Sequence, residues 1–137
     1  MYGKGQSPEY AGVITRFIER LSKELAPVIY GDGKQTRDFI SVNDVVSAIL
    51  LAIKLGDKPS RSDIFNIATG KSVSISELAR IMIKISGYDL EPIYEEERKG
   101  DIKYNEVDIT KSKNILGFAA SSNLKSELQR MLKQGIA

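Results

Sequence analysis

Apolar residues recur at intervals of three and four positions along several segments of the chain, which is the spacing of the buried stripe of an amphipathic helix. These stripes predict helices over residues 10–25, 43–55, 74–86 and 123–134, and a shorter helix is expected over residues 108–116. The helix over residues 43–55 is apolar over much of its circumference, which favours a position between two layers of the fold.

Residues that commonly begin or end helices stand next to these stripes. Ser41 or Asn43 is placed to cap the second helix, and Ser74 followed by Glu77 forms a capping box before the third. Gly87 is expected to end the third helix in a left-handed conformation. The pattern and the caps therefore predict the same helices.

Short runs of β-branched and aromatic residues between the helices predict strands. Val28–Tyr30 and Thr36–Ser41 are expected to form a hairpin around a glycine-containing turn at residues 31–34. Ile64–Ala68 is mostly apolar, as in strands covered on both faces, and Pro92–Tyr94 is a further short strand. The mixture of helices and strands predicts an α/β fold.

Composition limits the class of protein. The 137 residues, 42% hydrophobic and 28% charged, are typical of one soluble domain over residues 1–137. The net charge of +2 comes from scattered charges of both signs, which argues against nucleic acid as a partner. The absence of cysteine and histidine excludes thiol nucleophiles, disulfides and imidazole bases. No long apolar run or signal-like N-terminus occurs, so we predict no membrane association and a cytoplasmic location.

Six groups of residues follow one another along almost the whole chain in a particular order. They are Tyr2-Gly3, residues 7–14, residues 31–39, Phe65-Asn66-Ile67 with Gly70 and residues 74–78, Arg98-Lys99-Gly100-Asp101, and Asp108 with residues 111–117. In this order they resemble the C-terminal half of the nucleotide-sugar epimerases and dehydratases of the extended short-chain dehydrogenase family. The resemblance is closest to members with UDP-glucose 4-epimerase activity.

The resemblance implies the C-terminal portion of a Rossmann-type fold, with small mixed sheets and about five helices. In relatives, the part like residues 36–70 completes the dinucleotide-binding sheet. The family's glycine-rich NAD loop, Gly-x-x-Gly-x-x-Gly, does not occur in this sequence. The family's catalytic Tyr-x-x-x-Lys pair lies upstream of the loop that Tyr2-Gly3 resembles. We therefore expect a fragment without the dinucleotide-binding half.

By the same resemblance, the full-length relative is an NAD-dependent isomerase of carbohydrate metabolism that epimerises a UDP-hexose. The present segment is expected to bind the UDP-sugar and no NAD, and to be inactive alone because the NAD loop and the catalytic Tyr-x-x-x-Lys are absent. Two alternatives stay open. One is a fragment of a nucleotide-sugar dehydratase or reductase, and the other is a non-catalytic nucleotide-sugar-binding or interaction module.

Two arginines are the principal candidates for a substrate site. By resemblance Arg37 and Arg98 hold the substrate diphosphate, and a planar guanidinium offers paired donors to phosphate oxygens. The alternative for Arg37 is a structural ion pair with its neighbour Asp38. The alternative for Arg98 is a solvated position in the charged run of residues 95–99.

Four further site residues follow from the resemblance. Val28 and Tyr30 match a strand that runs beside the uracil in epimerases, and a plain structural strand is the alternative. Asp101 is expected to order its loop or to orient the nearby Arg98. Asn105 stands where some relatives carry a tyrosine that contacts the sugar nucleotide.

Other patterns that could suggest chemistry have plainer explanations. The segment over residues 31–34 lacks the strand–loop–helix setting of a phosphate-binding loop and is expected to be a turn. Asp32, Asp38 and Asp44 belong to different elements, so caps and ion pairs are expected rather than a metal site. The adjacent acids at residues 95–97 would not converge on one bond. We therefore predict no metal site and no catalytic residue in this segment.

An apolar strand edge at Ile64–Ala68 and an apolar helix face over residues 43–55 would be exposed without the dinucleotide-binding sheet. From this exposure we predict a homo-oligomer, formed by strand exchange or sheet pairing, or association with the N-terminal half of the family's fold.

Overall fold

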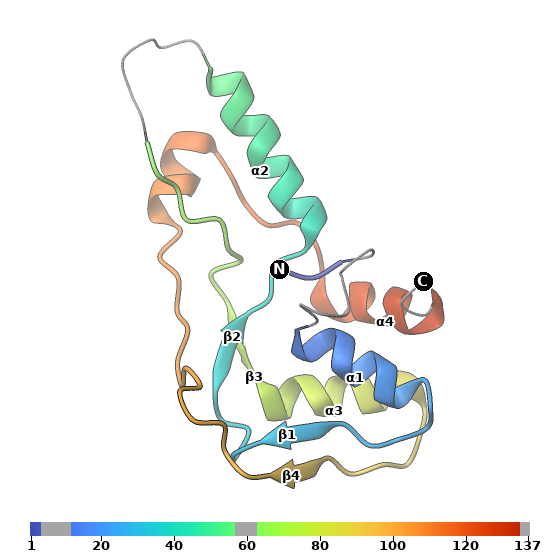
Figure 1. Cartoon of the computed structure of the whole chain (residues 1–137). Helices are drawn as coiled ribbons and strands as arrows, with labels where there is room; N and C mark the ends of the chain where they lie inside the picture. Colours follow the sequence, from blue (N-terminus) through green and yellow to red (C-terminus); the bar gives the residue numbers. More distant parts are fainter. Residues whose placement is uncertain (4–11, 57–62, 135–137) are drawn as a thin grey trace.

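Five helices and four short strands make up the described part of this computed structural model, which covers residues 1–3, 12–56 and 63–134 (Figure 1). In chain order they are α1 (Val13–Leu21), β1 (Val28–Tyr30), β2 (Thr36–Asp38), α2 (Val42–Leu55), β3 (Ser72–Ser74), α3 (Ile75–Ser86), β4 (Ile93–Glu95), the π-helix η2 (Ser112–Leu116) and α4 (Leu124–Gln134). The strands form two separate two-stranded sheets. The predicted α/β class with small sheets is confirmed.

The predicted hairpin between β1 and β2 is wrong, because each strand pairs with a later segment. β1 lies parallel to β4, with Tyr30 opposite Glu95, and β2 lies antiparallel to β3. Between β1 and β2, the carbonyls of Gly33 and Gln35 accept hydrogen bonds from the first two residues of α3, each at 3.0 Å. These backbone groups join the turn to α3 instead of closing a hairpin.

β2 ends at Asp38, three residues before the end that the pattern predicted. The backbone beyond it pairs with the N-terminal residues. The Tyr2 N–H donates to the Ile40 carbonyl at 2.9 Å, and the Val42 N–H donates to the Tyr2 carbonyl at 2.8 Å. This pairing holds the buried Tyr2 side chain, which is 3% exposed, inside the molecule.

The main hydrophobic core lies between α1, α3 and α4 and includes Ile29 of β1. Figure 1 shows α1 and α3 next to one another beside the β1–β4 pair. The fully buried side chains of this core include Phe17, Leu78, Met82 and Leu128. Each such side chain contributes about 1.5–3 kcal/mol relative to an exposed one, so this core is the main source of stability near the cavity described below.

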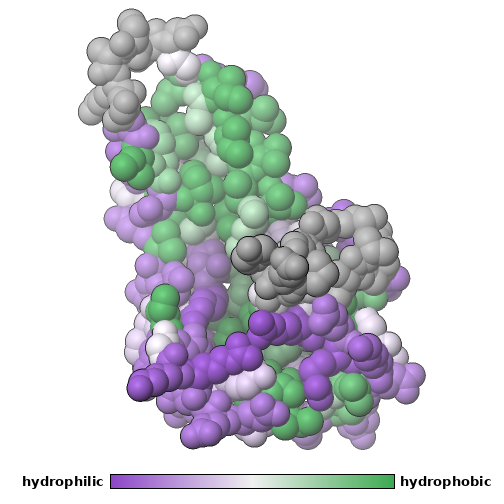
Figure 2. Space-filling model, in the orientation of Figure 1, coloured by the Kyte–Doolittle hydropathy of each residue, from purple (hydrophilic) through white to green (hydrophobic). Residues whose placement is uncertain are grey.

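Helix α2 packs on one side only, so the predicted position between two layers is wrong. Ala48 is buried against a smaller cluster that contains Leu116 and Phe118. The opposite side carries apolar side chains that are 46–67% exposed, and we call them the apolar face of α2: Val46, Ile49, Leu50, Ile53 and Leu55. Figure 2 shows a broad hydrophobic surface over this part of the molecule.

The predicted strand Ile64–Ala68 is also wrong, since these residues have no strand conformation. A strand needs a neighbouring backbone to satisfy its hydrogen bonds, and no described segment pairs with this run. Phe65 and Ile67 pack against the smaller cluster, whereas Ile64 is 87% exposed.

The predicted helix caps are confirmed. The Ser41 hydroxyl, and not Asn43, caps α2 by accepting the Asn43 N–H at 3.3 Å. The Ser74 hydroxyl accepts the Glu77 N–H at 3.1 Å at the start of α3. Gly87 ends α3 in the left-handed conformation, with φ of 78°.

Helix α1 is shorter than predicted and ends at Leu21. The turn that follows places Glu24 at φ of 56°, which a right-handed helix does not allow. The predicted short helix is present as η2, and the Asp108 carboxylate accepts the Thr110 N–H just before it. The expected helix start at residue 10 lies outside the described residues. None of the helices in the described ranges is long and apolar enough to cross a membrane.

Candidate functional site

A cavity of about 650 Å³, here called the main cavity, opens between the N-terminal residues, α1, β1, β2 and the loop that follows β4. All six residues proposed from the sequence line it: Val28, Tyr30, Arg37, Arg98, Asp101 and Asn105. They come from two stretches that are far apart in the sequence, residues 28–37 and residues 98–105. The fold therefore brings the candidate residues to one place, as a shared ligand would require.

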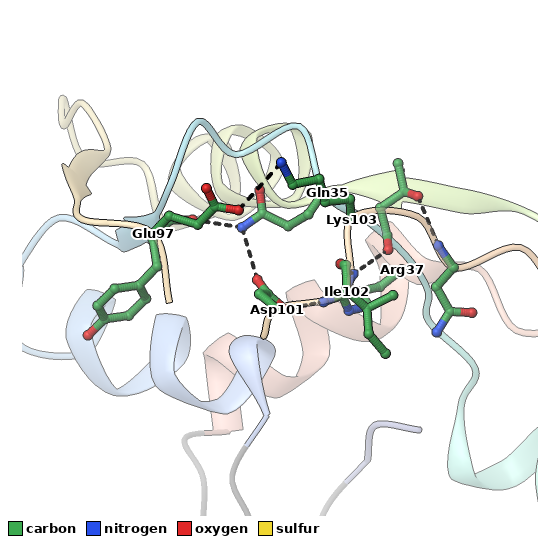
Figure 3. A network of polar contacts seen from close by, with 9 residues as sticks. Gln35, Arg37, Glu97, Asp101, Ile102 and Lys103 are labelled. Carbon is green, nitrogen blue, oxygen red and sulfur yellow. Dashed lines mark hydrogen bonds and ion pairs between the residues drawn. The ribbon is translucent and has the colours of Figure 1, made fainter. Parts of the chain in front are cut away.

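Arg37 is held at the cavity wall by three hydrogen bonds. Its Nη1 donates to the carbonyls of Thr36 at 2.7 Å and Ile102 at 2.5 Å, and its Nη2 donates to Asp101 Oδ1 at 2.5 Å (Figure 3). A guanidinium has five N–H donors, so two of them are not engaged by the residues that the structure describes. The side chain is positioned and still has donors for a ligand.

Asp38 does not form the ion pair with Arg37 that was the structural alternative for this arginine. Successive side chains of a strand point to opposite sides, and the Asp38 carboxylate binds the loop after Ala68 instead. It accepts the N–H and the hydroxyl of Thr69, both at 2.9 Å, and the N–H of Gly70 at 2.8 Å. That alternative is therefore wrong.

Arg98 reaches the same cavity from the loop after β4. Its guanidinium carbon lies 3.7 Å from the centroid of the Tyr30 ring, well within the range of a cation–π interaction. The residue is exposed, as its place in a charged run suggested, but its guanidinium lies against an aromatic side chain of the cavity.

The Asp101 carboxylate orients Arg37, whereas the sequence predicted that it orders its loop or orients Arg98. The second carboxylate oxygen of Asp101 accepts a long hydrogen bond of 3.5 Å from Gln35 Nε2, which also donates to the Tyr30 carbonyl at 2.7 Å (Figure 3). Gln35 thus links β1 to the loop after β4. Gln35 was not predicted as a site residue, although its position two residues before Arg37 places both on one side of an extended chain.

Asn105 and Val28 complete the predicted set. Val28 supplies a half-buried apolar side chain from the start of β1. Asn105 is held through its backbone, because its N–H donates to the Thr36 hydroxyl at 3.4 Å and its carbonyl accepts from the Ser72 hydroxyl at 2.6 Å. The neighbouring Tyr104 is 74% exposed and lines a smaller adjacent cavity of about 250 Å³.

Tyr2 also lines the main cavity. Burial raises the pKa of Tyr2 to about 12, and the nearby negative charges of Glu127 and Asp44 act in the same direction. Its hydroxyl therefore stays protonated at neutral pH and is not suited to act as a general base.

One tyrosine–lysine pair with the family's catalytic spacing does occur, at Tyr30 and Lys34, so the expectation that the sequence lacks Tyr-x-x-x-Lys is wrong. Residues four apart share a face on a helix, but here Tyr30 ends β1 and Lys34 lies in the next turn. The Lys34 side chain is 83% exposed, and its Nζ lies 3.9 Å from the Asp32 carboxylate. The pair therefore lacks a shared helical face.

The described residues do not fit a Rossmann-type NAD site. Such a site needs a glycine-rich turn from a strand into a helix N-terminus. The glycine turn after β1 leads into β2, and the two strands that lead directly into helices, β2 and β3, are followed by no glycine before the helix. We derive no chemical step through NAD from this part of the chain.

The three aspartates considered for a metal have structural partners. Asp32 accepts the Lys34 N–H at 2.9 Å within the predicted turn, and Asp44 accepts the N–H groups of Ser121 and Ser122 at 2.9 and 3.3 Å. Across residues 1–3, 12–56 and 63–134, no group of three or more acidic side chains is arranged to hold a metal ion.

Comparisons with known proteins agree with this geometry. Residues 1–68 match the NAD dependent epimerase/dehydratase family. The UDP-glucose 4-epimerase of Thermotoga maritima, solved with UDP-glucose, superposes with a TM-score of 0.85 and 37% identity over 96% of this chain and 42% of that one. The UDP-glucose 4-epimerase of Mycolicibacterium smegmatis is 34% identical over 86% of this chain and 37% of its own length.

A third relative was solved with both a nucleotide sugar and a dinucleotide. It is the UDP-glucuronic acid 4-epimerase of Bacillus cereus in complex with UDP-glucuronic acid and NAD, with a TM-score of 0.84 and 26% identity over 97% of this chain and 42% of that one. The chain therefore spans about two fifths of the length of these relatives. Together with the order of its motifs, these matches show that the chain belongs to the NAD dependent epimerase/dehydratase family and corresponds to the C-terminal part of its longer members.

Proposed function

We propose that this chain is the part of a UDP-sugar 4-epimerase that binds the nucleotide sugar. The observation that carries the proposal is that Arg37 and Arg98, from distant parts of the sequence, line one cavity. Two guanidinium groups offer several charged donors to the oxygens of a diphosphate, and charge-assisted bonds of this kind are among the strongest hydrogen bonds in proteins.

The rest of the main cavity fits the other parts of such a ligand. Its volume of about 650 Å³ lies within the usual range of small-molecule sites. Val28 and Phe39 contribute apolar surface, and Asn105 adds a polar group. The lining therefore combines apolar surface with polar and charged side chains, which suits a ligand that has a ring system and a charged diphosphate.

The relatives support a UDP-hexose as the ligand, since two of their structures were solved with UDP-glucose and UDP-glucuronic acid. A dTDP-glucose 4,6-dehydratase of Streptomyces griseus is also 34% identical over 93% of this chain. The diphosphate is common to both ligand classes, so a dehydratase fragment is the alternative. We favour the 4-epimerase because the Thermotoga maritima enzyme, which carries that activity in its name, is 37% identical to this chain, compared with 34% for the dehydratase.

UDP binding tests the site directly. We expect titration calorimetry to show UDP binding to the unmodified chain, and Arg37→Ala to weaken it by about 10- to 100-fold, because hydrogen bonds to charged groups are worth about 1.5–3 kcal/mol. Arg80→Ala is the matched control, because Arg80 is exposed on α3 and does not line the main cavity. Equal affinity in Arg37→Ala and the unmodified chain would remove Arg37 from the site.

We propose further that this chain alone binds no NAD and does not catalyse epimerisation, and that NAD is held by polypeptide outside these residues. The support is the lack of a glycine-rich strand-to-helix turn in the described part, and the separation of Tyr30 and Lys34 onto a strand and a turn. Incubation of the purified chain with NAD and UDP-galactose is expected to yield no UDP-glucose. Formation of UDP-glucose would contradict the proposal.

The exposed apolar face of α2 supports self-association, and we propose that a second copy of the chain covers it in solution. Large exposed apolar surfaces commonly mark interfaces. The cytoplasmic location and the role in carbohydrate metabolism stay predictions.

A further inference from the structure

We propose that Tyr30 is a positioning residue whose ring holds the Arg98 guanidinium at the main cavity, ready for the substrate phosphates. The proposal rests on the function proposed above for the nature of the ligand, and on the contact between the two side chains for its geometry. In this proposal the Tyr30 ring contacts an arginine side chain instead of the uracil base of the ligand.

Arg98 begins a tight turn that carries two cavity residues. The Asp101 N–H donates to the Arg98 carbonyl at 3.2 Å, and Gly100 between them has φ of 86°. A positive φ at the third position is typical of a type II turn and favours glycine there. The turn therefore carries Arg98 at one end and Asp101 at the other, both on the cavity lining.

The two ends of this turn are held in different ways. Asp101 is fixed by its bonds to Arg37 and Gln35. For Arg98, no described residue accepts a hydrogen bond or forms an ion pair with the guanidinium, and its contact is with the Tyr30 ring at 3.7 Å. Tyr30 is thus the main constraint on where this guanidinium lies.

An aromatic ring is well suited to hold a phosphate-binding arginine. The ring face attracts the cation through its quadrupole and accepts none of the N–H donors along the edge of the guanidinium. All five N–H donors of the Arg98 guanidinium remain for a ligand, whereas Arg37 donates three hydrogen bonds to protein acceptors. A carboxylate partner would also have cancelled the positive charge.

Tyr30 is itself firmly placed. It is the last residue of β1 and lies opposite Glu95 of β4. Beyond it, the Gly31 N–H donates to the Glu95 carbonyl at 2.9 Å, and the Tyr30 carbonyl accepts from Gln35. The ring therefore stands on an ordered strand end, and Arg98 follows Glu95, the strand partner of Tyr30, by three residues.

Substitutions at Tyr30 test the proposal when binding is measured for two ligands, UDP and inorganic pyrophosphate. We expect Tyr30→Leu to weaken both by about three- to tenfold, because it removes the cation–π contact. Tyr30→Phe keeps the ring and is expected to bind within about twofold of the unmodified chain. Tyr94→Leu is the matched control, since Tyr94 lies on β4, is 50% exposed and does not line the main cavity.

The same substitution in an Arg98→Ala background separates the two roles of the ring. If Tyr30 acts through Arg98, adding Tyr30→Leu to Arg98→Ala has no further effect on either ligand. A Tyr30→Leu effect that persists without Arg98, on UDP and not on pyrophosphate, would mean that the ring contacts the base, and would overturn the inference.

A measurement without ligand keeps the inference separate from the proposed function. The Arg98 side-chain N–H signal, identified by its loss in Arg98→Lys, is expected to show a ring-current shift in NMR spectra of the unmodified chain and Tyr30→Phe, and to lose it in Tyr30→Leu. No change on Tyr30→Leu would overturn the inference. If the ring-current shift is present and UDP does not bind, the proposed function is wrong, but the contact between Arg98 and the Tyr30 ring is supported.

Discussion

At the scale of single residues, the Arg37-Asp38 pair shows how a strand separates adjacent charges. Arg37 turns to the main cavity and Asp101, and Asp38 turns to the loop at Thr69 and Gly70. Opposite charges next to one another in sequence suggest an ion pair, but the alternation of a strand sends them to different partners. The arginine is thereby available to a ligand.

Asp44 is a second residue whose role depends on distant partners. The residue is 2% exposed, and its carboxylate accepts the N–H and hydroxyl of Ser121 and the N–H of Ser122. Burial raises the pKa of Asp44, but the hydrogen bonds from Ser121 and Ser122 outweigh it and leave the pKa below its ordinary value of 3.8. The ionised carboxylate therefore joins the start of α2 to the segment before α4.

We expect Asp44→Asn to lower the free energy of unfolding by about 1–3 kcal/mol at pH 7. Because the folded-state pKa lies below that of the unfolded chain, the contribution of Asp44 is present above about pH 4 and is lost as the pH falls through the folded-state pKa. Urea unfolding at pH 7 and pH 3 measures this difference between variant and unmodified chain. Asp89→Asn, at an exposed position, is the control, and a pH-independent difference for Asp44→Asn would contradict the prediction.

At the scale of elements, one serine joins a sheet to a helix. Ser74 pairs with Thr36 as the last residue of β3 and also caps α3. The strand therefore passes into the helix with no loop between them. This junction places β2, with Arg37, at a fixed position relative to the core helix α3.

Ser74→Ala is expected to lower the free energy of unfolding by about 0.5–2 kcal/mol, the usual cost of losing an N-cap side chain. Denaturant unfolding followed by circular dichroism measures it. Ser47→Ala is the matched control, because Ser47 is exposed within α2 and its hydroxyl bonds back to the Asn43 carbonyl, a bond that adds little to helix stability. Equal losses in the two variants would contradict a capping role for Ser74.

At the scale of the whole molecule, α2 stands apart from the main core. It is anchored by Ala48 to the smaller cluster and by Asp44 to the segment before α4, while its apolar face remains uncovered by the described residues. The main cavity is lined by other elements. Association through α2 and ligand binding are therefore expected to be separable.

We expect the unmodified chain to sediment as a dimer or larger species at micromolar concentration, and Ile53→Lys to shift it toward the monomer, because a charge would be buried in the contact. Ile53 belongs to the apolar face of α2 and is 67% exposed. Leu25→Lys, at a position outside α2 that is 47% exposed, is the matched control. A strictly monomeric unmodified chain would refute the proposed self-association.

The parts of this protein that could be predicted from its sequence are those decided by neighbouring residues. Helical stripes, the caps at Ser41 and Ser74, and the end of α3 at Gly87 depend on contacts within one or two turns. The order of the motifs was enough to identify the family, since each motif is itself a local pattern. The helices, the family and the candidate arginines could therefore be predicted from the sequence alone, whereas the strands were predicted only in part.

How those elements pack and pair depends on contacts between distant parts of the chain. Three contacts join residues that are far apart in sequence. They are the pairing of β1 with β4 instead of β2, the hydrogen bond from Arg37 to Asp101, and the cation–π contact of Arg98 with Tyr30. An apolar stripe indicates that a helix can be buried but does not specify what covers it. For this reason the prediction that α2 lies between two layers was wrong. Local preferences set each element, whereas partners across the fold are chosen by the packing of the whole chain.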